Sequence, residues 1–187
     1  MKNAIILQGA GETQESFWLP YVKDNLEKLG YDVWLPQLPD NDNPNINKTL
    51  PFVLKNGKFT EDTVIIAHSA GCPLALAVLQ KINIKIKKVI LVAGYWRELP
   101  PPGANKALLK EFNWKIIREN AENFIFIHSD NDPWGCDDKQ GREMFDKLGG
   151  TLIVKHGEGH MGSDSFNQPY KEFPLLVTLV ENKLWGK

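Results

Sequence analysis

The chain has 187 residues, of which 42% are hydrophobic and 24% are charged, a balance typical of one globular domain spanning residues 1–187. Lys and Arg total 22 against 23 Asp and Glu, and this net charge of -1 disfavours a nucleic-acid-binding protein, which normally carries a basic excess. Two cysteines, a short apolar start and the absence of a long apolar run favour a reduced, cytoplasmic protein without a disulfide framework, signal peptide or membrane span.

Short apolar runs alternate with helical patterns along the chain. In chain order the predicted elements are strand Ala4–Gln8, helix Phe17–Leu29, strand Tyr31–Leu35, a loop over Pro36–Lys48, one or two helical turns over Leu50–Leu54, strand Thr63–Ala67, helix Ala70–Ile82, strand Lys88–Ala93, a loop over Gly94–Gly103, helix Ala107–Ala121, strand Phe124–His128, a helix near Lys139–Leu148, strand Thr151–Val154 and helix Pro174–Lys183. Strands that are apolar throughout are buried on both faces. The pattern therefore predicts an α/β fold, a six-stranded and mostly parallel sheet with helices on both faces.

The segment from Ala67 to Gly71 reads Ala-His-Ser-Ala-Gly, at the point where the third predicted strand ends and a helix begins. This is the layout of a nucleophile elbow, Gly-x-Ser-x-Gly, with alanine at the first position. The turn is so tight that only small side chains fit at the two flanking positions, and Ala67 and Gly71 meet that requirement. Ser69 is therefore a candidate nucleophile. The alternative is a plain strand–helix turn in which Ser69 only caps the helix.

A nucleophilic serine needs a histidine base, and the base needs a carboxylate that orients it. After the fifth predicted strand the chain reads Ser129-Asp130-Asn131-Asp132-Pro133. Asp132 is the better candidate for the acid because Pro133 fixes the backbone after it, whereas Asp130 could cap the turn. An Asx–Pro turn without a catalytic role is the alternative.

A loop rich in glycine follows the sixth predicted strand and contains His156 and His160. His160 is favoured as the base because it stands between Gly159 and Gly162, while His156 still belongs to the strand end. A single histidine in a loop is usually only solvated, so the argument for His160 as the base depends on its position after the sixth strand. The chain order Ser69, Asp132, His160 is that of the α/β-hydrolase fold and differs from the chymotrypsin and subtilisin orders.

Two backbone N–H groups are candidates for an oxyanion hole. The Ala70 N–H begins the helix after Ser69, and the Ala10 N–H lies in the Gly9-Ala10-Gly11 stretch after the first strand. A flexible glycine turn without a catalytic role is the alternative for this stretch.

No long insertion separates the fourth and fifth predicted strands, so we expect no separate cap domain and a shallow site. Trp134, Trp96 and Met161 lie on loops near the candidate triad and are candidate substrate-binding residues, although rim packing is an alternative for each. Cys72 and Cys136, with a nearby histidine, match no zinc spacing, and we expect no metal site.

At these motifs the sequence resembles the small, lidless α/β-hydrolase serine hydrolases, the family to which retinoblastoma-binding protein 9 belongs. The resemblance covers nearly the whole chain. Its most specific segments are 65–71, 89–93, 112–117, 129–133 and 159–161. It implies Ser69 as nucleophile, Asp132 as acid and His160 as base, with activity on small esters and, in some members, amides. The chain departs from the family pattern at Ala67, where glycine is usual, and in the Gly9-Ala10-Gly11 loop.

We therefore expect a serine hydrolase that cleaves small carboxylic esters or amides through an acyl-enzyme. No cofactor is needed, and no nucleic-acid, membrane or protein partner is predicted. The alternative is a catalytically weak or inactive binding protein built on a hydrolase fold.

Overall fold

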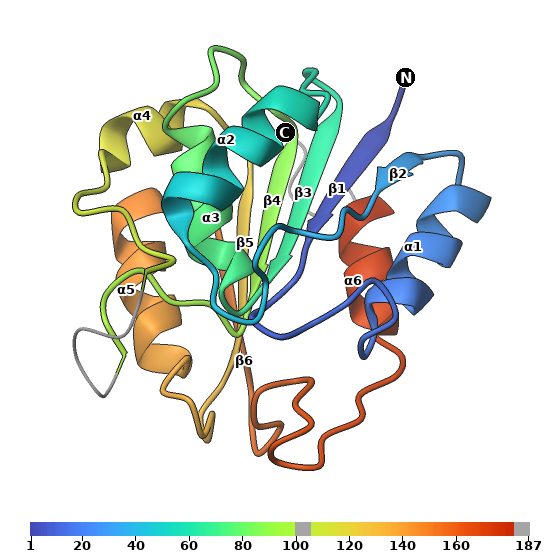
Figure 1. Cartoon of the computed structure of the whole chain (residues 1–187), viewed down its shortest axis with the longest axis vertical. Coiled ribbons are helices and arrows are strands. Elements are labelled where there is room, and N and C mark those ends of the chain that lie inside the picture. Colours follow the sequence, from blue (N-terminus) through green and yellow to red (C-terminus); the bar gives the residue numbers. More distant parts are fainter. Residues whose placement is uncertain (100–105, 182–187) are drawn as a thin grey trace.

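The computed structural model describes residues 1–99 and 106–181 (Figure 1). The predicted loop over Gly94–Gly103 lies outside the described residues from position 100 onward, and the predicted helix Pro174–Lys183 lies outside them from position 182. Within the described ranges, no helix is long and apolar enough to cross a membrane.

Six parallel strands form one sheet in the order β2-β1-β3-β4-β5-β6. The strands are β1 (Asn3–Leu7), β2 (Asp32–Trp34), β3 (Thr63–His68), β4 (Lys88–Val92), β5 (Phe124–Ser129) and β6 (Thr151–Lys155). Every residue of β1, β3, β4 and β5 is buried, as expected for strands that helices cover on both faces. The predicted six-stranded sheet is confirmed, and all of its strand pairs are parallel.

Two helical layers enclose the sheet (Figure 1). One layer holds α1 (Leu19–Lys28) and α6 (Pro174–Glu181), and the other holds α2 (Ile46–Asn56), α3 (Gly71–Leu79), α4 (Trp114–Glu119) and α5 (Asp138–Leu148). Successive strand residues point to opposite layers. In β1, Ile6 packs in the core under α1 and α6, whereas Ile5 packs in the core under the other four helices.

Helices α1 and α3 are one to three residues shorter at an end than predicted. Helices α2 and α4 differ more from their predicted bounds, and in each of these two an asparagine cap decides where the helix begins. The predicted helix Ala107–Ala121 is reduced to α4, because Asn113 Oδ1 accepts the Ile116 N–H at 3.2 Å and starts the helix there. The predicted turns over Leu50–Leu54 belong to a longer helix, α2. Its start is fixed by Asn45, whose side chain accepts the Asn47 N–H at 3.0 Å.

Candidate active site

The turn between β3 and α3 presents Ser69. Its φ is 49°, in the left-handed region that non-glycine residues rarely adopt. The Ser69 N–H donates to the Val92 carbonyl at 3.0 Å, and the Ser69 carbonyl accepts the Cys72 N–H at 3.0 Å. A β-carbon at Gly71 would lie 2.3 Å from the Leu7 carbonyl oxygen, so only glycine fits where α3 passes β1. The strained serine and its small neighbours have the form of a nucleophile elbow.

Asp132 and His160 meet beyond the carboxyl ends of β5 and β6. His160 Nδ1 lies 2.7 Å from Asp132 Oδ2, and both residues are buried. The other carboxylate oxygen, Oδ1, accepts the Trp134 N–H at 2.8 Å, which fixes the orientation of the carboxylate. Because an ionised carboxylate only accepts hydrogen bonds, Nδ1 of His160 carries the hydrogen. Nε2 is left as the basic nitrogen of the neutral ring.

Asp130 and His156 pair with each other. They are the less favoured candidates for the acid and the base in the sequence. His156 Nδ1 lies 2.5 Å from Asp130 Oδ2, and the His156 side chain is 95% exposed. The hydrogen bond and charge of Asp130 raise the pKa of His156 above its ordinary value. This exposed pair joins the two loops and leaves Asp132 and His160 to each other.

The loop of His160 is fastened to the loop of Asp132 by a series of hydrogen bonds. Three successive backbone N–H groups of the first loop donate to three successive side chains of the second. The pairs are Gly157 N–H to Asp130 Oδ1 (2.9 Å), Glu158 N–H to Ser129 Oγ (3.0 Å) and Gly159 N–H to Asn131 Oδ1 (2.8 Å). The His160 N–H itself donates to Gln168 Oε1 at 2.8 Å. The backbone of His160 is therefore held from both sides.

Ser69 and His160 line the same cavity, which has a volume of about 410 Å³. That volume lies within the range of small-molecule sites. Among the described residues, the others that line it are Ala10, Gly11, Glu12, Ser16, Phe17, Ala70, Tyr95, Leu99, Trp134, Cys136, Gly162, Ser163, Asp164 and Ser165. Asp132 lies behind His160 and does not reach the cavity wall.

Ala10 and Ala70, the candidate oxyanion donors, both line this cavity. The neighbouring N–H groups of the first loop are already used, because the Gly9 N–H donates to Glu12 Oε2 at 2.7 Å and the Gly11 N–H donates to the Asn41 carbonyl at 2.8 Å. Neither Ala10 nor Ala70 donates its N–H to any residue in the described part of the chain. Both N–H groups remain available to a ligand.

Of the three candidate substrate-binding residues, only Trp134 lines the cavity. Met161 is fully buried in the core, and its carbonyl accepts the indole N–H of Trp18 at 2.9 Å. Trp96 packs on the other face of the sheet, against Trp114, and its indole N–H donates to Glu143 Oε2 at 3.0 Å. Neither Met161 nor Trp96 is among the described residues that line the cavity.

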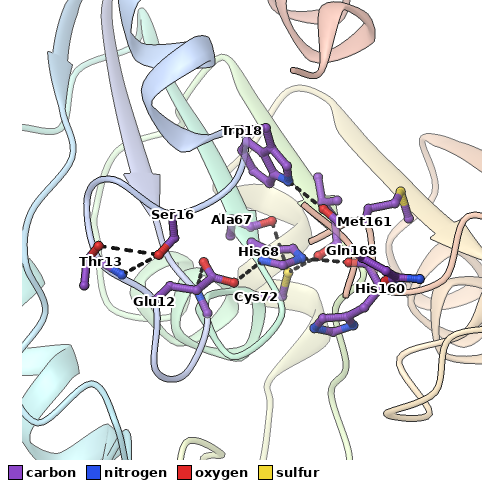
Figure 2. A network of polar contacts seen from close by, with 12 residues as sticks. Glu12, Thr13, Ser16, Trp18, Ala67, His68, Cys72, His160, Met161 and Gln168 are labelled. Atoms are coloured by element: carbon purple, nitrogen blue, oxygen red, sulfur yellow. Dashed lines mark hydrogen bonds and ion pairs between the residues drawn. The ribbon is translucent and has the colours of Figure 1, made fainter. Parts of the chain in front are cut away.

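Sequence reasoning misses three buried polar residues beside the site, Glu12, Asn41 and His68. The Asn41 side chain donates to the carbonyls of Gly9 and Glu12, at 2.7 Å each, and so shapes the loop of Ala10. Glu12 contacts His68, and His68 in turn contacts the backbone carbonyl of His160 (Figure 2). In the sequence, only its position next to Ser69 marks His68 as a residue of the site. Nothing in the pattern marks Glu12 or Asn41.

Asp132, Cys136 and His160 place a carboxylate oxygen, a sulfur and a ring nitrogen within 4.8 Å of one another, a grouping that could hold a metal ion. Two observations disfavour that use. The Asp132 oxygen already accepts the His160 hydrogen bond, and burial raises the pKa of the Cys136 thiol well above its ordinary value. A protonated thiol is a poor metal ligand.

The sequence pattern of the family described as Serine hydrolase matches residues 4–180. The chain belongs to the serine hydrolase family. It is therefore an enzyme, as predicted. The serine hydrolase RBBP9 of Rattus norvegicus is 25% identical over 176 residues, which cover 91% of each chain. The ydeN gene product of Bacillus subtilis (strain 168) is 28% identical over 192 residues, which cover 96% of this chain and 94% of the relative.

Solved structures share the fold of this chain. The crystal structure of the B. subtilis ydeN gene product has a TM-score of 0.87 to this serine hydrolase at 22% identity, covering 96% of this chain and 97% of the other. Est1E from Butyrivibrio proteoclasticus, solved with ferulic acid bound, has a TM-score of 0.69 at 14% identity, covering 97% and 87%. The predicted α/β-hydrolase fold without a separate cap domain is confirmed.

Proposed function

We propose that this serine hydrolase cleaves small carboxylic esters or amides with Ser69, His160 and Asp132 as its catalytic triad. The observation that carries the proposal is the 2.7 Å hydrogen bond from His160 to Asp132 beside a cavity that His160 shares with Ser69. With Nδ1 committed to Asp132, Nε2 of His160 is the nitrogen that can take the Ser69 proton.

The reaction proceeds in two halves. Nε2 of His160 takes the hydroxyl proton as Ser69 Oγ attacks the substrate carbonyl carbon. Asp132 holds the imidazole in the required tautomer and stabilises the imidazolium. His160 then protonates the leaving alcohol or amine, which departs and leaves an acyl-Ser69 ester. Water, deprotonated by His160, attacks the carbonyl carbon of that ester. The bond to Ser69 Oγ then breaks, His160 returns the proton to Oγ, and the carboxylic acid leaves.

The Ala10 and Ala70 N–H groups are the proposed donors to the oxyanion. Each lines the cavity, and each is free of hydrogen bonds within the described residues. Fixed donors at this point stabilise the negative charge that develops in the transition state more than the neutral ground-state carbonyl. The Asn41 contacts support the proposal, because they hold the loop of Ala10 in one shape.

The cavity favours a small, neutral acyl group. Phe17, Tyr95 and Trp134 supply aromatic surface, and no described lining residue is Lys or Arg. A carboxylate-bearing substrate would find no lysine or arginine among the described lining residues, while Asp164 would repel it.

Hydrolysis of p-nitrophenyl esters of increasing acyl length tests this function. We expect measurable turnover of the acetate and butyrate, with kcat/KM roughly 10-fold or more above that of long-chain esters, because a cavity of about 410 Å³ cannot enclose a long acyl chain together with the nitrophenyl group. Folded protein that hydrolyses none of these esters, and no corresponding anilide, would overturn the proposal.

Activity should persist into mildly acidic conditions. Burial lowers the pKa of His160 below its ordinary value of 6.5, and the neighbouring charge on His68 adds to this effect, although Asp132 opposes it. The neutral imidazole is the active base, so kcat/KM should rise with pH through an ionisation below pH 6.5 and be level at neutral pH. A profile of kcat/KM over about pH 4.5–9 measures this. An acidic limb centred above pH 6.5 would contradict the expectation.

A further inference from the structure

A buried pair, Glu12 and His68, lies beside the proposed triad and takes no part in the proton transfers (Figure 2). Glu12 belongs to the loop that carries Ala10, and His68 is the last residue of β3. Glu12 Oε1 lies 2.5 Å from His68 Nδ1, and the side chains are 7% and 1% exposed. Two such polar groups are tolerated in the interior only when they satisfy each other.

The pair connects three loops of the site. On one side, Glu12 Oε2 accepts the Gly9 N–H at 2.7 Å. On the other side, His68 Nε2 lies 2.9 Å from the carbonyl oxygen of His160, and because a carbonyl only accepts, Nε2 carries a hydrogen. A continuous chain of hydrogen bonds therefore runs from the loop of Ala10, through the residue before Ser69, to the backbone of His160.

Both ring nitrogens of His68 face oxygen atoms, an arrangement that suits an imidazolium beside a carboxylate. Burial opposes the charged forms, but the attraction between Glu12 and His68 and their hydrogen bond lower the pKa of Glu12 and raise the pKa of His68. The contacts and the charges together favour an ion pair.

This ion pair places a positive charge next to the proposed base. The ring centroids of His68 and His160 are 4.9 Å apart. The titratable groups that face His160 are His68 from β3, Glu12 from the loop after β1, and Asp132 and Cys136 from the loop after β5. Asp132 favours the protonated form of His160, whereas His68 disfavours it.

We propose that Glu12 and His68 are positioning residues for the reaction: their ion pair fixes the oxyanion loop and the backbone of His160 relative to Ser69, and its positive end keeps His160 in the neutral, basic form. This inference rests on the proposed triad. Neither residue touches the reacting atoms in that mechanism, so both act through His160 and the loop of Ala10.

The variant Glu12→Gln tests the role. Glutamine keeps the length of the side chain, accepts the Gly9 N–H and donates to a neutral His68, so the contacts survive while the two charges are lost. We expect kcat to fall roughly 10-fold with little change in KM, because the remaining neutral hydrogen bonds are weaker and hold the loops of Ala10 and His160 less firmly. We also expect the acidic limb of kcat/KM to move to higher pH, because His160 loses a positive neighbour.

Two further variants separate charge from structure. Glu15→Gln removes an exposed carboxylate from the same segment and should match the parent in kcat and in pH profile. Glu12→Asp keeps the charge on a shorter side chain, so it should lower kcat but leave the acidic limb close to that of the parent. If Glu12 had a purely structural role, the acidic limb of kcat/KM would stay in place in Glu12→Gln. Parent-like kcat and an unmoved limb in that variant would overturn the proposal.

A measurement on the parent protein does not depend on turnover or on how a variant folds. In ¹⁵N spectra at about pH 7.5, His68 should show hydrogens on both ring nitrogens, unlike a free histidine at that pH. A neutral His68 with one bare nitrogen would overturn the proposal at any level of activity. If the parent cleaves no ester, the proposed function fails, and the spectrum still decides the state of the pair.

Discussion

Ser69→Ala is expected to reduce kcat for every ester substrate by about 10⁴-fold or more, while the protein still folds. The reason is that the Ser69 hydroxyl is the attacking group in the proposed mechanism, and neither cysteine is in a state to replace it. Cys136 lies in the cavity wall, but burial raises the pKa of its thiol well above the ordinary value. Burial also raises the pKa of Cys72, which is fully buried. Steady-state hydrolysis of p-nitrophenyl acetate measures the loss.

Thr178→Ala is a matched control for this variant. It removes an exposed hydroxyl from α6, on a residue outside the cavity lining, and should leave kcat and KM at parent values. Near-parent kcat in Ser69→Ala, with the parent's thermal unfolding curve, would contradict the assignment of the nucleophile.

Asp132→Asn is expected to reduce kcat by about 10⁴-fold without unfolding the protein. The Trp134 N–H needs an acceptor, so the amide oxygen of the asparagine should take the place of Oδ1. The amide NH₂ then faces His160 Nδ1 and donates to it. That contact forces the hydrogen onto Nε2, and the nitrogen that should take the Ser69 proton is blocked.

Asp130→Asn makes the same chemical change two residues away and serves as the comparison. Asp130 is the partner of the exposed His156, so its replacement should change kcat by no more than a few-fold. The pH profile adds a second criterion: Asp130→Asn leaves the tautomer of His160 unchanged and should keep the profile of the parent. Retention of parent-like kcat in Asp132→Asn would exclude the proposed role of the carboxylate.

The sheet could be predicted from the sequence because its strands are apolar at nearly every position. Burial on both faces imposes that composition, and the helices between the strands then require parallel order. The bounds of the helices were harder to predict. Asn113 and Asn45 begin helices through side-chain hydrogen bonds, which a pattern of apolar residues does not reveal. The elbow is readable because its tight turn restricts the residues around Ser69 to small ones.

The choice of Asp132 and His160 over Asp130 and His156 rests in the sequence on the positions of proline and glycine. The structure adds the reason that the sequence lacks: His156 pairs with Asp130, and His160 pairs with Asp132. The position of a residue in the sequence does not predict the direction of its side chain. Trp96 is a near neighbour of the cavity residue Tyr95, yet it lies on the opposite face of the sheet.

The contact between Glu12 and His68 could not be predicted, because the two residues are 56 positions apart. A glutamate in a loop after a strand is usually a solvated surface residue. Only the folded chain brings it against the residue before Ser69 and buries both.

The most direct test of the central claim is to locate the adduct that a fluorophosphonate probe forms with the protein, by mass spectrometry of its peptides. Such probes phosphonylate a serine only when a neighbouring base activates it. Our account predicts one adduct per chain, on Ser69, that is lost in His160→Ala. An adduct on another residue, or none on folded parent protein, would contradict it.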